Sequence, residues 1–201
     1  MSVPPYPWLQ VARSTYPDMN YLLSEGACAR YVLAAHYVRN QRQVVEIGGF
    51  KTPITAFLTR VPERVLVVDP LLREYRGEEL NGHPCRVEHI ATTFQRHTFH
   101  LAPGAYGLVL LGASMKHFSP DSALRQVECE KLVGLVSNAA VAVLEFALEW
   151  ELGKDNIAGI LDSARFEVIM QADLDLSKSP GMDTAHYRRR FIVLKPIADT
   201  P

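Results

Sequence analysis

The sequence has few cysteines, and their positions argue against cysteine-based structure. Cys28, Cys85 and Cys129 are far apart and odd in number. A disulfide framework needs several pairs, and a Cys-x-x-Cys metal site needs two cysteines close together. We therefore expect all three to be small core residues.

An excess of charge of one sign is also missing. Lys and Arg together number 21, Asp and Glu together number 22, and the formal net charge is −1. Proteins that bind RNA or DNA usually carry a basic surface, because Lys and Arg neutralise the phosphates. The charge balance therefore disfavours a nucleic-acid partner.

Long hydrophobic runs are absent as well. No run approaches the roughly 20 apolar residues that a membrane-spanning helix needs. The N-terminus lacks the basic segment and apolar core of a signal peptide. We expect a cytoplasmic protein with no membrane partner.

The chain of 201 residues is 48% hydrophobic, which suits one domain with a substantial core. We predict this domain over residues 20–201. Residues 1–19 are rich in proline and aromatic residues, a composition that favours an N-terminal arm or lid without regular structure.

A glycine turn after a buried strand is the central feature of the sequence. Residues 44–47 are mostly apolar, and Gly48 and Gly49 follow them directly. Glycines let the backbone turn sharply and leave room for a ligand. Thr52 and Pro53 then predict the N-cap and the first residue of a helix. In an open α/β sheet, ligands bind at corners of this kind.

A second strand strengthens this prediction. Residues 65–68 are all apolar, and Asp69 follows them, 23 residues after Glu46. In dinucleotide-binding folds, a carboxylate about 20 residues past the glycine turn holds the ribose hydroxyls.

This order of strand, acidic residue, glycine turn, helix, strand and aspartate resembles motifs one and two of class I S-adenosylmethionine-dependent methyltransferases. The first motif of that family is Glu/Asp-x-Gly-x-Gly-x-Gly. Glu46 and Gly48 match it, whereas Phe50 and Thr52 stand where the second and third glycines belong. The resemblance implies S-adenosyl-L-methionine as the cofactor. It also implies an α/β, Rossmann-like fold with a mainly parallel seven-stranded sheet, a C-terminal antiparallel hairpin and helices on both faces.

The resemblance further implies which residues bind the cofactor. They follow the first four strands of the predicted sheet: Glu46, Gly48, Gly49 and Phe50, then Asp69 and Pro70, then Thr92, Thr93 and Phe94, and finally Gly112 and Ala113. We expect Asp69 on the ribose and Thr92 to Phe94 near the adenine. Hydroxyls of a turn and a phenylalanine of the core explain these last three equally well.

The remaining segments complete the predicted sheet. Their patterns indicate strands at 85–90, 106–111 and 140–146, and helices at 20–38, 71–80, 119–137 and 155–164. Two strands, 166–176 and 187–195, follow one another without a helix between them, which implies a hairpin. The methyltransferase fold ends in this way, and ordinary dinucleotide-binding domains do not.

Histidines are the candidate catalytic residues. Methyl transfer from a sulfonium needs close positioning and sometimes a base. His117 is the first candidate, because it follows the fourth strand closely and an imidazole titrates near neutral pH. His97 and His100 are alternatives, and an ordinary surface role also explains each of the three. The His97-x-x-His100 pair, with His89 or Glu88, is a weak metal candidate, since no third ligand stands at a diagnostic spacing.

Other charged residues leave open alternatives. The fourth strand lacks the Asp that would hold magnesium in catechol-type methyltransferases, so we expect no metal. Glu145 lies inside a buried strand and either faces the site or pairs with a neighbouring base. Arg188, Arg189 and Arg190 begin the last strand as solvated charges, or one of them meets an anionic group of the substrate.

Three functions are compatible with these observations. We expect a methyltransferase that acts on a small molecule, with a homodimer as one possible assembly. The second is a methyltransferase-like protein that has lost catalysis and serves as a binding or assembly module. The third is a nicotinamide-dependent oxidoreductase, against which the broken Gly-x-Gly-x-x-Gly pattern and the terminal hairpin argue.

Overall fold

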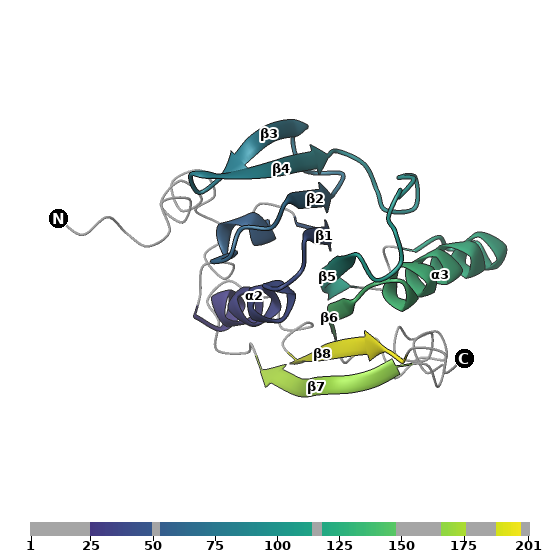
Figure 1. Cartoon of the computed structure of the whole chain (residues 1–201). Helices are drawn as coiled ribbons and strands as arrows, with labels where there is room; N and C mark the ends of the chain where they lie inside the picture. Colours follow the sequence, from purple (N-terminus) through teal and green to yellow (C-terminus); the bar gives the residue numbers. More distant parts are fainter. Residues whose placement is uncertain (1–24, 50–52, 114–117, 148–165, 176–187, 198–201) are drawn as a thin grey trace.

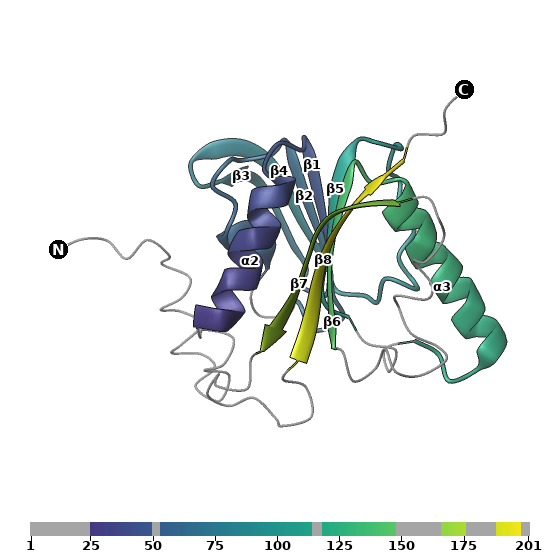
Figure 2. The ribbon, with the colours of Figure 1, turned by 90° about the horizontal axis from the view of Figure 1, so that it is seen from below.

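The computed structural model describes residues 25–49, 53–113, 118–147, 166–175 and 188–197. Within them, an eight-stranded sheet has the strand order β3-β4-β2-β1-β5-β6-β8-β7 (Figure 1). Helix α2 (Glu25–Val38) lies on one face of the sheet and α3 (Ser122–Ser137) on the other (Figure 2). The predicted α/β layering is confirmed.

The middle of the sheet is parallel. Its strands, in spatial order, are β4 (His83–Ile90), β2 (Arg64–Val68), β1 (Gln43–Ile47), β5 (Tyr106–Ala113) and β6 (Val141–Ala147). Their apolar runs are buried because helices or loops cover both faces. The carboxyl ends of these strands all lie at the same edge of the sheet, and that edge carries the candidate site.

The two late strands are antiparallel, as predicted. β8 (Arg188–Pro196) pairs in the antiparallel sense with both β6 and β7 (Phe166–Asp175). The parallel sheet therefore ends in an antiparallel element.

The helix predicted over residues 71–80 is wrong, and so is the count of seven strands. β3 (Tyr75–Leu80) is an edge strand that pairs antiparallel with β4. Asn81 and Gly82 join the two strands with φ values of 53° and 79°. Positive φ at both central residues is the signature of a two-residue hairpin turn, for which Asn-Gly is the preferred sequence.

The helix predicted after the glycine turn is also wrong in length. In the described residues 53–63 the helical structure is limited to a 3-10 turn, η2 (Ile54–Ala56), and its N-cap is Pro53, which offers no side-chain hydrogen bond. The amide of Ile54 is instead bound by the carboxylate of Glu46. The predicted cap, Thr52, lies outside the described residues, as do the predicted helix at 155–164 and the predicted arm at 1–19.

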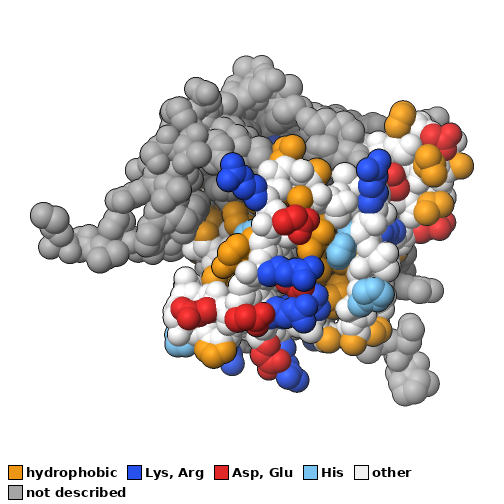
Figure 3. Space-filling model, turned by 90° about the horizontal axis from the view of Figure 1, so that it is seen from above, with side chains coloured by type: hydrophobic (Ala, Val, Ile, Leu, Met, Phe, Trp, Pro, Cys, Tyr) orange, Lys and Arg blue, Asp and Glu red, His pale blue; other side chains and the backbone are white. Residues whose placement is uncertain are grey.

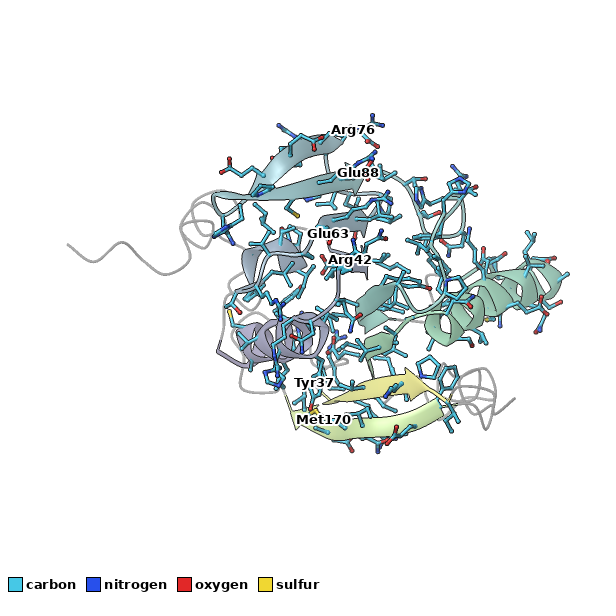
Figure 4. The ribbon with its side chains drawn as sticks, viewed as in Figure 1. Tyr37, Arg42, Glu63, Arg76, Glu88 and Met170 are labelled. Carbon is cyan, nitrogen blue, oxygen red and sulfur yellow. The ribbon has the colours of Figure 1, made fainter. Side chains whose placement is uncertain are left out.

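The core has two parts, one on each face of the sheet. On one face α2 buries Tyr31, Ala34, Ala35 and Val38, which share one side of the helix. Tyr37 of α2 and Met170 of β7 pack against the same part (Figure 4). On the other face α3 buries residues such as Leu132 and Val136 against β1 and β5. Cys85 and Cys129 are buried as predicted, whereas Cys28 is half-buried.

The amino edge of the sheet is charged and open to solvent. Arg42 and Glu63, which precede β1 and β2, form an exposed ion pair of 2.7 Å (Figure 4). In the part of the chain that the structure describes, no helix is both long enough and apolar enough to cross a bilayer.

Candidate functional site

A cavity of about 460 Å³ lies at the carboxyl edge of the sheet. Six residues predicted to bind a cofactor line it: Gly48, Asp69, Pro70, Thr93, Phe94 and Gly112. They come from four separate segments, which follow β1, β2 and β4 or end β5. The fold therefore brings together residues that are up to 64 positions apart in the sequence.

Three predicted site residues within the described ranges, Glu46, Gly49 and Thr92, are not among those that line the cavity. The amide of Thr92 donates a 2.9 Å hydrogen bond to the carbonyl of Ile90. Ala113 ends β5, opposite Phe146 of β6. Phe50 lies outside the described residues, so its effect on the space for a cofactor stays a prediction.

Several lining residues were missing from the prediction. They are Ile47, Val68, Leu71, Gln95, Leu110 and Leu111. Ile47 and Val68 are the last residues of their strands. Both could have been predicted from the sequence, because the last side chain of a parallel strand lies at the carboxyl edge of the sheet, where ligands bind.

The glycine turn has two conformational requirements. Gly48 has φ of +84°, and its amide donates a 3.0 Å hydrogen bond to the carbonyl of Val68. Residues with a Cβ rarely adopt this φ. At Gly49, an added Cβ would lie 2.6 Å from both Glu46 Oε2 and Val67 Cγ1. The turn can therefore lie against β2 only because both residues are glycine.

Glu46 anchors the segment that follows the glycine turn. Its side chain is 1% exposed, and Oε2 accepts a 2.6 Å hydrogen bond from the amide of Ile54. Burial raises the pKa of Glu46 to about 8; the bond from Ile54 opposes this shift, and the charge of Asp69 adds to it. The carboxyl is therefore largely neutral at pH 7, and its role is to position the turn.

Asp69 is fixed at the wall of the cavity. It is 6% exposed, its Oδ1 accepts a 2.7 Å hydrogen bond from the amide of Leu71, and its own amide donates to the carbonyl of Ile90 at 3.2 Å. This local turn is typical of aspartate and holds the carboxylate in one orientation. A fixed carboxylate is a good acceptor for ligand hydroxyls.

Two aromatic rings form an apolar wall. Phe94 and Phe118 contact each other edge to face, with ring centroids 5.6 Å apart and planes 68° apart. Such pairs are favourable beyond the area that they bury. The wall offers a surface on which a planar ligand group can pack.

Glu145 lies on the other side of Gly112 and is fully buried. Arg30 Nη1 donates to both of its carboxylate oxygens, at 3.1 and 2.9 Å. Arg189 Nε lies 3.3 Å from Oε1, and the amide of Gly112 donates to Oε2 at 2.8 Å. The pairing alternative for Glu145 is therefore confirmed; Glu145 does not line the cavity, but it bonds to Gly112, which does.

Two of the three candidate bases do not line the cavity. His117 lies outside the described residues, and neither His97 nor His100 is a lining residue. The ring of His97 packs edge-on against Phe99, and burial together with the nearby Lys131 lowers its pKa. The carbonyl of His97 accepts a 2.6 Å hydrogen bond from Lys131 Nζ of α3.

The geometry does not support the alternative of a metal site at His97 and His100 with His89 or Glu88. Glu88 is held by Arg64 at 2.7 Å and by Arg86 at 3.0 Å. Within the described ranges, no three His, Cys, Asp or Glu side chains are grouped so that they could hold a metal ion.

No protein-family model matches the chain, and no curated protein matches it in sequence. Solved structures do match. N-methyltransferase NodS from Bradyrhizobium japonicum, crystallised with S-adenosyl-L-homocysteine, is 12% identical, with coverage of 86% of this chain and 88% of NodS and a TM-score of 0.58.

Two further structures show how widely this fold is used. A 1,6-didemethyltoxoflavin-N1-methyltransferase from Burkholderia thailandensis is 14% identical, with coverage of 98% of this chain and 92% of that one and a TM-score of 0.53. An rRNA methylase from Streptococcus thermophilus is 10% identical, with coverage of 87% and 98% and a TM-score of 0.52. At these identities the likeness shows a shared fold and leaves the acceptor open. The expected absence of a nucleic-acid partner therefore rests on charge alone.

Proposed function

We propose that this chain, which has the fold of the class I methyltransferases, transfers a methyl group from S-adenosyl-L-methionine to a small-molecule acceptor. The observation that carries the proposal is the cavity at the carboxyl edge of the sheet, where Gly48, Asp69 and Phe94 converge from three segments. Its volume of about 460 Å³ lies within the range of ordinary small-molecule sites, roughly 300 to 1,000 Å³.

The described residues fit the proposed cofactor. Asp69 would accept hydrogen bonds from the ribose hydroxyls, and the bare backbone at Gly48 would let the ligand approach closely. Thr93 and Phe94 would contact the adenine through a hydroxyl and an aromatic ring. The cavity wall is mainly apolar, with Phe94 and Phe118 packed together on one side.

Methyl transfer requires few further protein groups. When bound, S-adenosyl-L-methionine supplies a methyl group on a positively charged sulfur, ready for attack by a nucleophile. The chain contributes by holding two molecules in one orientation, which removes much of the entropic barrier. We propose His117 as the base; His117→Ala should lower kcat and leave cofactor affinity unchanged. An unchanged kcat would remove that role.

Calorimetric titration with S-adenosyl-L-methionine and S-adenosyl-L-homocysteine tests the proposal. We expect micromolar binding of both, and a loss of about 1 to 3 kcal/mol in Asp69→Ala, because hydroxyls of the ligand would lose their buried acceptor. Asp173→Ala on β7 is the matched control, since this aspartate pairs with Arg190 instead. If the wild-type protein binds neither ligand, the proposed function is wrong.

A methyltransferase-like binding or assembly protein without catalysis is the second candidate. The 3-10 turn at Ile54–Ala56 favours it, because the described residues 53–63 after the glycine turn form no α-helix. Phe50 and Thr52 in place of the motif glycines favour it too. Cofactor affinity without turnover on any acceptor would identify this function.

The proposal also specifies the kind of methyl acceptor, which is a small molecule. The face above β3 and β4 shows acidic and basic side chains intermixed (Figure 3), and Arg64 and Arg86 both contact Glu88. A nucleic-acid substrate would call for a surface of mainly basic character. Radiolabelled methyl groups should enter a small-molecule extract and leave total RNA unlabelled. Labelled RNA would overturn this part. A cytoplasmic location stays a prediction.

A further inference from the structure

Two arginines share one buried carboxylate beside the cavity. Glu145 of β6 is 0% exposed, Arg30 of α2 is 6% exposed, and the Arg189 side chain of β8 is 13% exposed. The cluster of Arg30, Glu145 and Arg189 therefore carries an excess of positive charge in a place with little water. Buried charge is costly unless an opposite charge or hydrogen bonds compensate it.

Glu145 does not need Arg189 to satisfy its oxygens. Arg30 Nη1 donates to both oxygens, and the amide of Gly112 donates to Oε2 at 2.8 Å. Arg189 Nε lies at 3.3 Å from Oε1 but makes no hydrogen bond there. The carboxylate is therefore already engaged by three donor contacts.

Arg189 makes fewer hydrogen bonds than its guanidinium could donate. Its buried Nε and Nη1 have no hydrogen-bond partner among the described residues. A guanidinium presents its N–H groups as a planar fork that matches a carboxylate. Unpaired buried donors of this kind are expensive, so an acceptor supplied by a ligand would be favourable.

Arg189 lies next to the cavity wall at Gly112. Gly112 lines the cavity, and a Cβ built on it would have Arg189 Nη1 as its nearest described neighbour, 3.9 Å away. Arg189 pairs with Ala147 at the carboxyl end of β6. The proposed cofactor residues Gly48, Asp69 and Phe94 follow β1, β2 and β4, which lie on the other side of β5 from β6 and β8.

We propose that the methyl acceptor carries a carboxylate and that Arg189 binds it. This inference rests on the proposed function and narrows its substrate class. Arg30 holds Glu145, Glu145 fixes Gly112, and Arg189 offers to the acceptor the Nη1 group that has no partner among the described residues. Arg30 Nη1 is engaged by Glu145, whereas Arg189 Nη1 has no hydrogen-bond partner among the described residues, so Arg189 is the residue that selects for charge.

Ligand-observed NMR with matched pairs tests the inference. Acetate and acetamide, benzoate and benzamide, and indole-3-acetate and its amide are titrated into protein saturated with S-adenosyl-L-homocysteine. We expect the carboxylate of at least one pair to bind ten-fold more tightly than its neutral amide. Arg189→Gln should abolish this preference. If no pair shows the preference, or if Arg189→Gln keeps it, the inference is wrong.

Controls separate charge recognition from a loss of structure. Arg190→Gln removes the neighbouring arginine, which pairs with Asp173, and should keep the preference. Arg189→Lys keeps the charge but loses the fork, and we expect an intermediate preference. If Arg189→Gln does not fold, the inference is tested by the preference of the wild-type protein for the carboxylate and by the preference of Arg189→Lys.

The same samples distinguish this inference from the proposed function. If S-adenosyl-L-homocysteine binds and the amides bind as well as the carboxylates, only the inference fails. If S-adenosyl-L-homocysteine does not bind, the proposed function fails. In that case, titrating each carboxylate and its amide into the ligand-free protein still tests whether Arg189 binds a carboxylate.

Discussion

Glu46 Oε2 accepts a 2.6 Å hydrogen bond from the backbone amide of Ile54, eight residues further along the chain. The bond ties the end of β1 to the turn that follows Gly48 and Gly49. Both partners are buried, Glu46 at 1% exposure and Ile54 at 0%. The glycine turn is therefore anchored by a group that does not itself line the cavity.

The protonation of Glu46 should make stability depend on pH. Burial raises its pKa from 4.5 to about 8, so between these values the folded state binds more protons than the unfolded state. The free energy of unfolding should therefore fall as pH rises from about 5 to about 8, by at most about 1.4 kcal/mol per pH unit. Glu46→Gln should flatten this dependence in urea titrations, since an amide mimics the neutral carboxyl.

Other groups act in the opposite direction and have to be subtracted. Burial lowers the pKa values of His89 and His97 below 6.5, so their contribution to stability grows as pH rises. Both histidines are present in the wild type and in Glu46→Gln. The difference between the two profiles therefore isolates Glu46, and parallel profiles would contradict the prediction.

Gly49→Ala should disturb the same turn by overpacking. The new Cβ would lie 2.6 Å from Glu46 Oε2 and Val67 Cγ1, both of them in the core. We expect a loss of about 1 to 3 kcal/mol in unfolding free energy, together with weaker binding of S-adenosyl-L-homocysteine by calorimetry. Gly134→Ala in α3 is the matched control, because no described atom lies within 4 Å of its Cβ. It should be neutral or stabilise by up to about 1 kcal/mol, and equal losses in both variants would count against the clash.

The sequence identified elements whose local signals agree with their burial. The apolar run of Val65–Val68 predicted β2, and Asp121 caps α3 by accepting a 2.9 Å hydrogen bond from Leu124. β3 was missed because it is an exposed edge strand without an apolar period. Its hairpin signal, Asn81-Gly82, was present and was interpreted as the end of a helix. A turn signal alone does not say what precedes it.

The site was predictable only in part, for a related reason. Residues that follow a strand, such as Gly48 and Asp69, can be placed at the carboxyl edge from the strand pattern alone. Arg30 and Glu145 are 115 positions apart, and no spacing rule connects a helix residue to a strand so far along the chain. Such contacts depend on the strand order, which local patterns do not determine.

Glu145→Gln should be strongly destabilising. It would leave Arg30 and Arg189 buried without the charge that compensates them, and breaking a buried ion pair in this way costs about 3 to 5 kcal/mol. Asp173→Asn is the comparison, because its pair with Arg190 is partly exposed and should contribute at most about 1 kcal/mol. Urea unfolding at pH 7 measures both. A Glu145→Gln variant as stable as Asp173→Asn would mean that the cluster is not compensated as described.

Phe94→Leu should weaken cofactor binding as well as the fold. Phe94 loses its edge-to-face contact with Phe118, worth about 0.5 to 1.5 kcal/mol of stability, and the cavity loses its aromatic surface. Calorimetry with S-adenosyl-L-homocysteine should show an affinity loss of about ten-fold.

Phe99→Leu is the matched control for this substitution. Its ring contacts His97 and Lys131 outside the cavity, so the variant should lose stability to a similar extent and keep its affinity. If both substitutions weakened binding equally, the loss would come from a general loosening of the segment after β4. Only a loss confined to Phe94→Leu assigns the aromatic wall to the ligand.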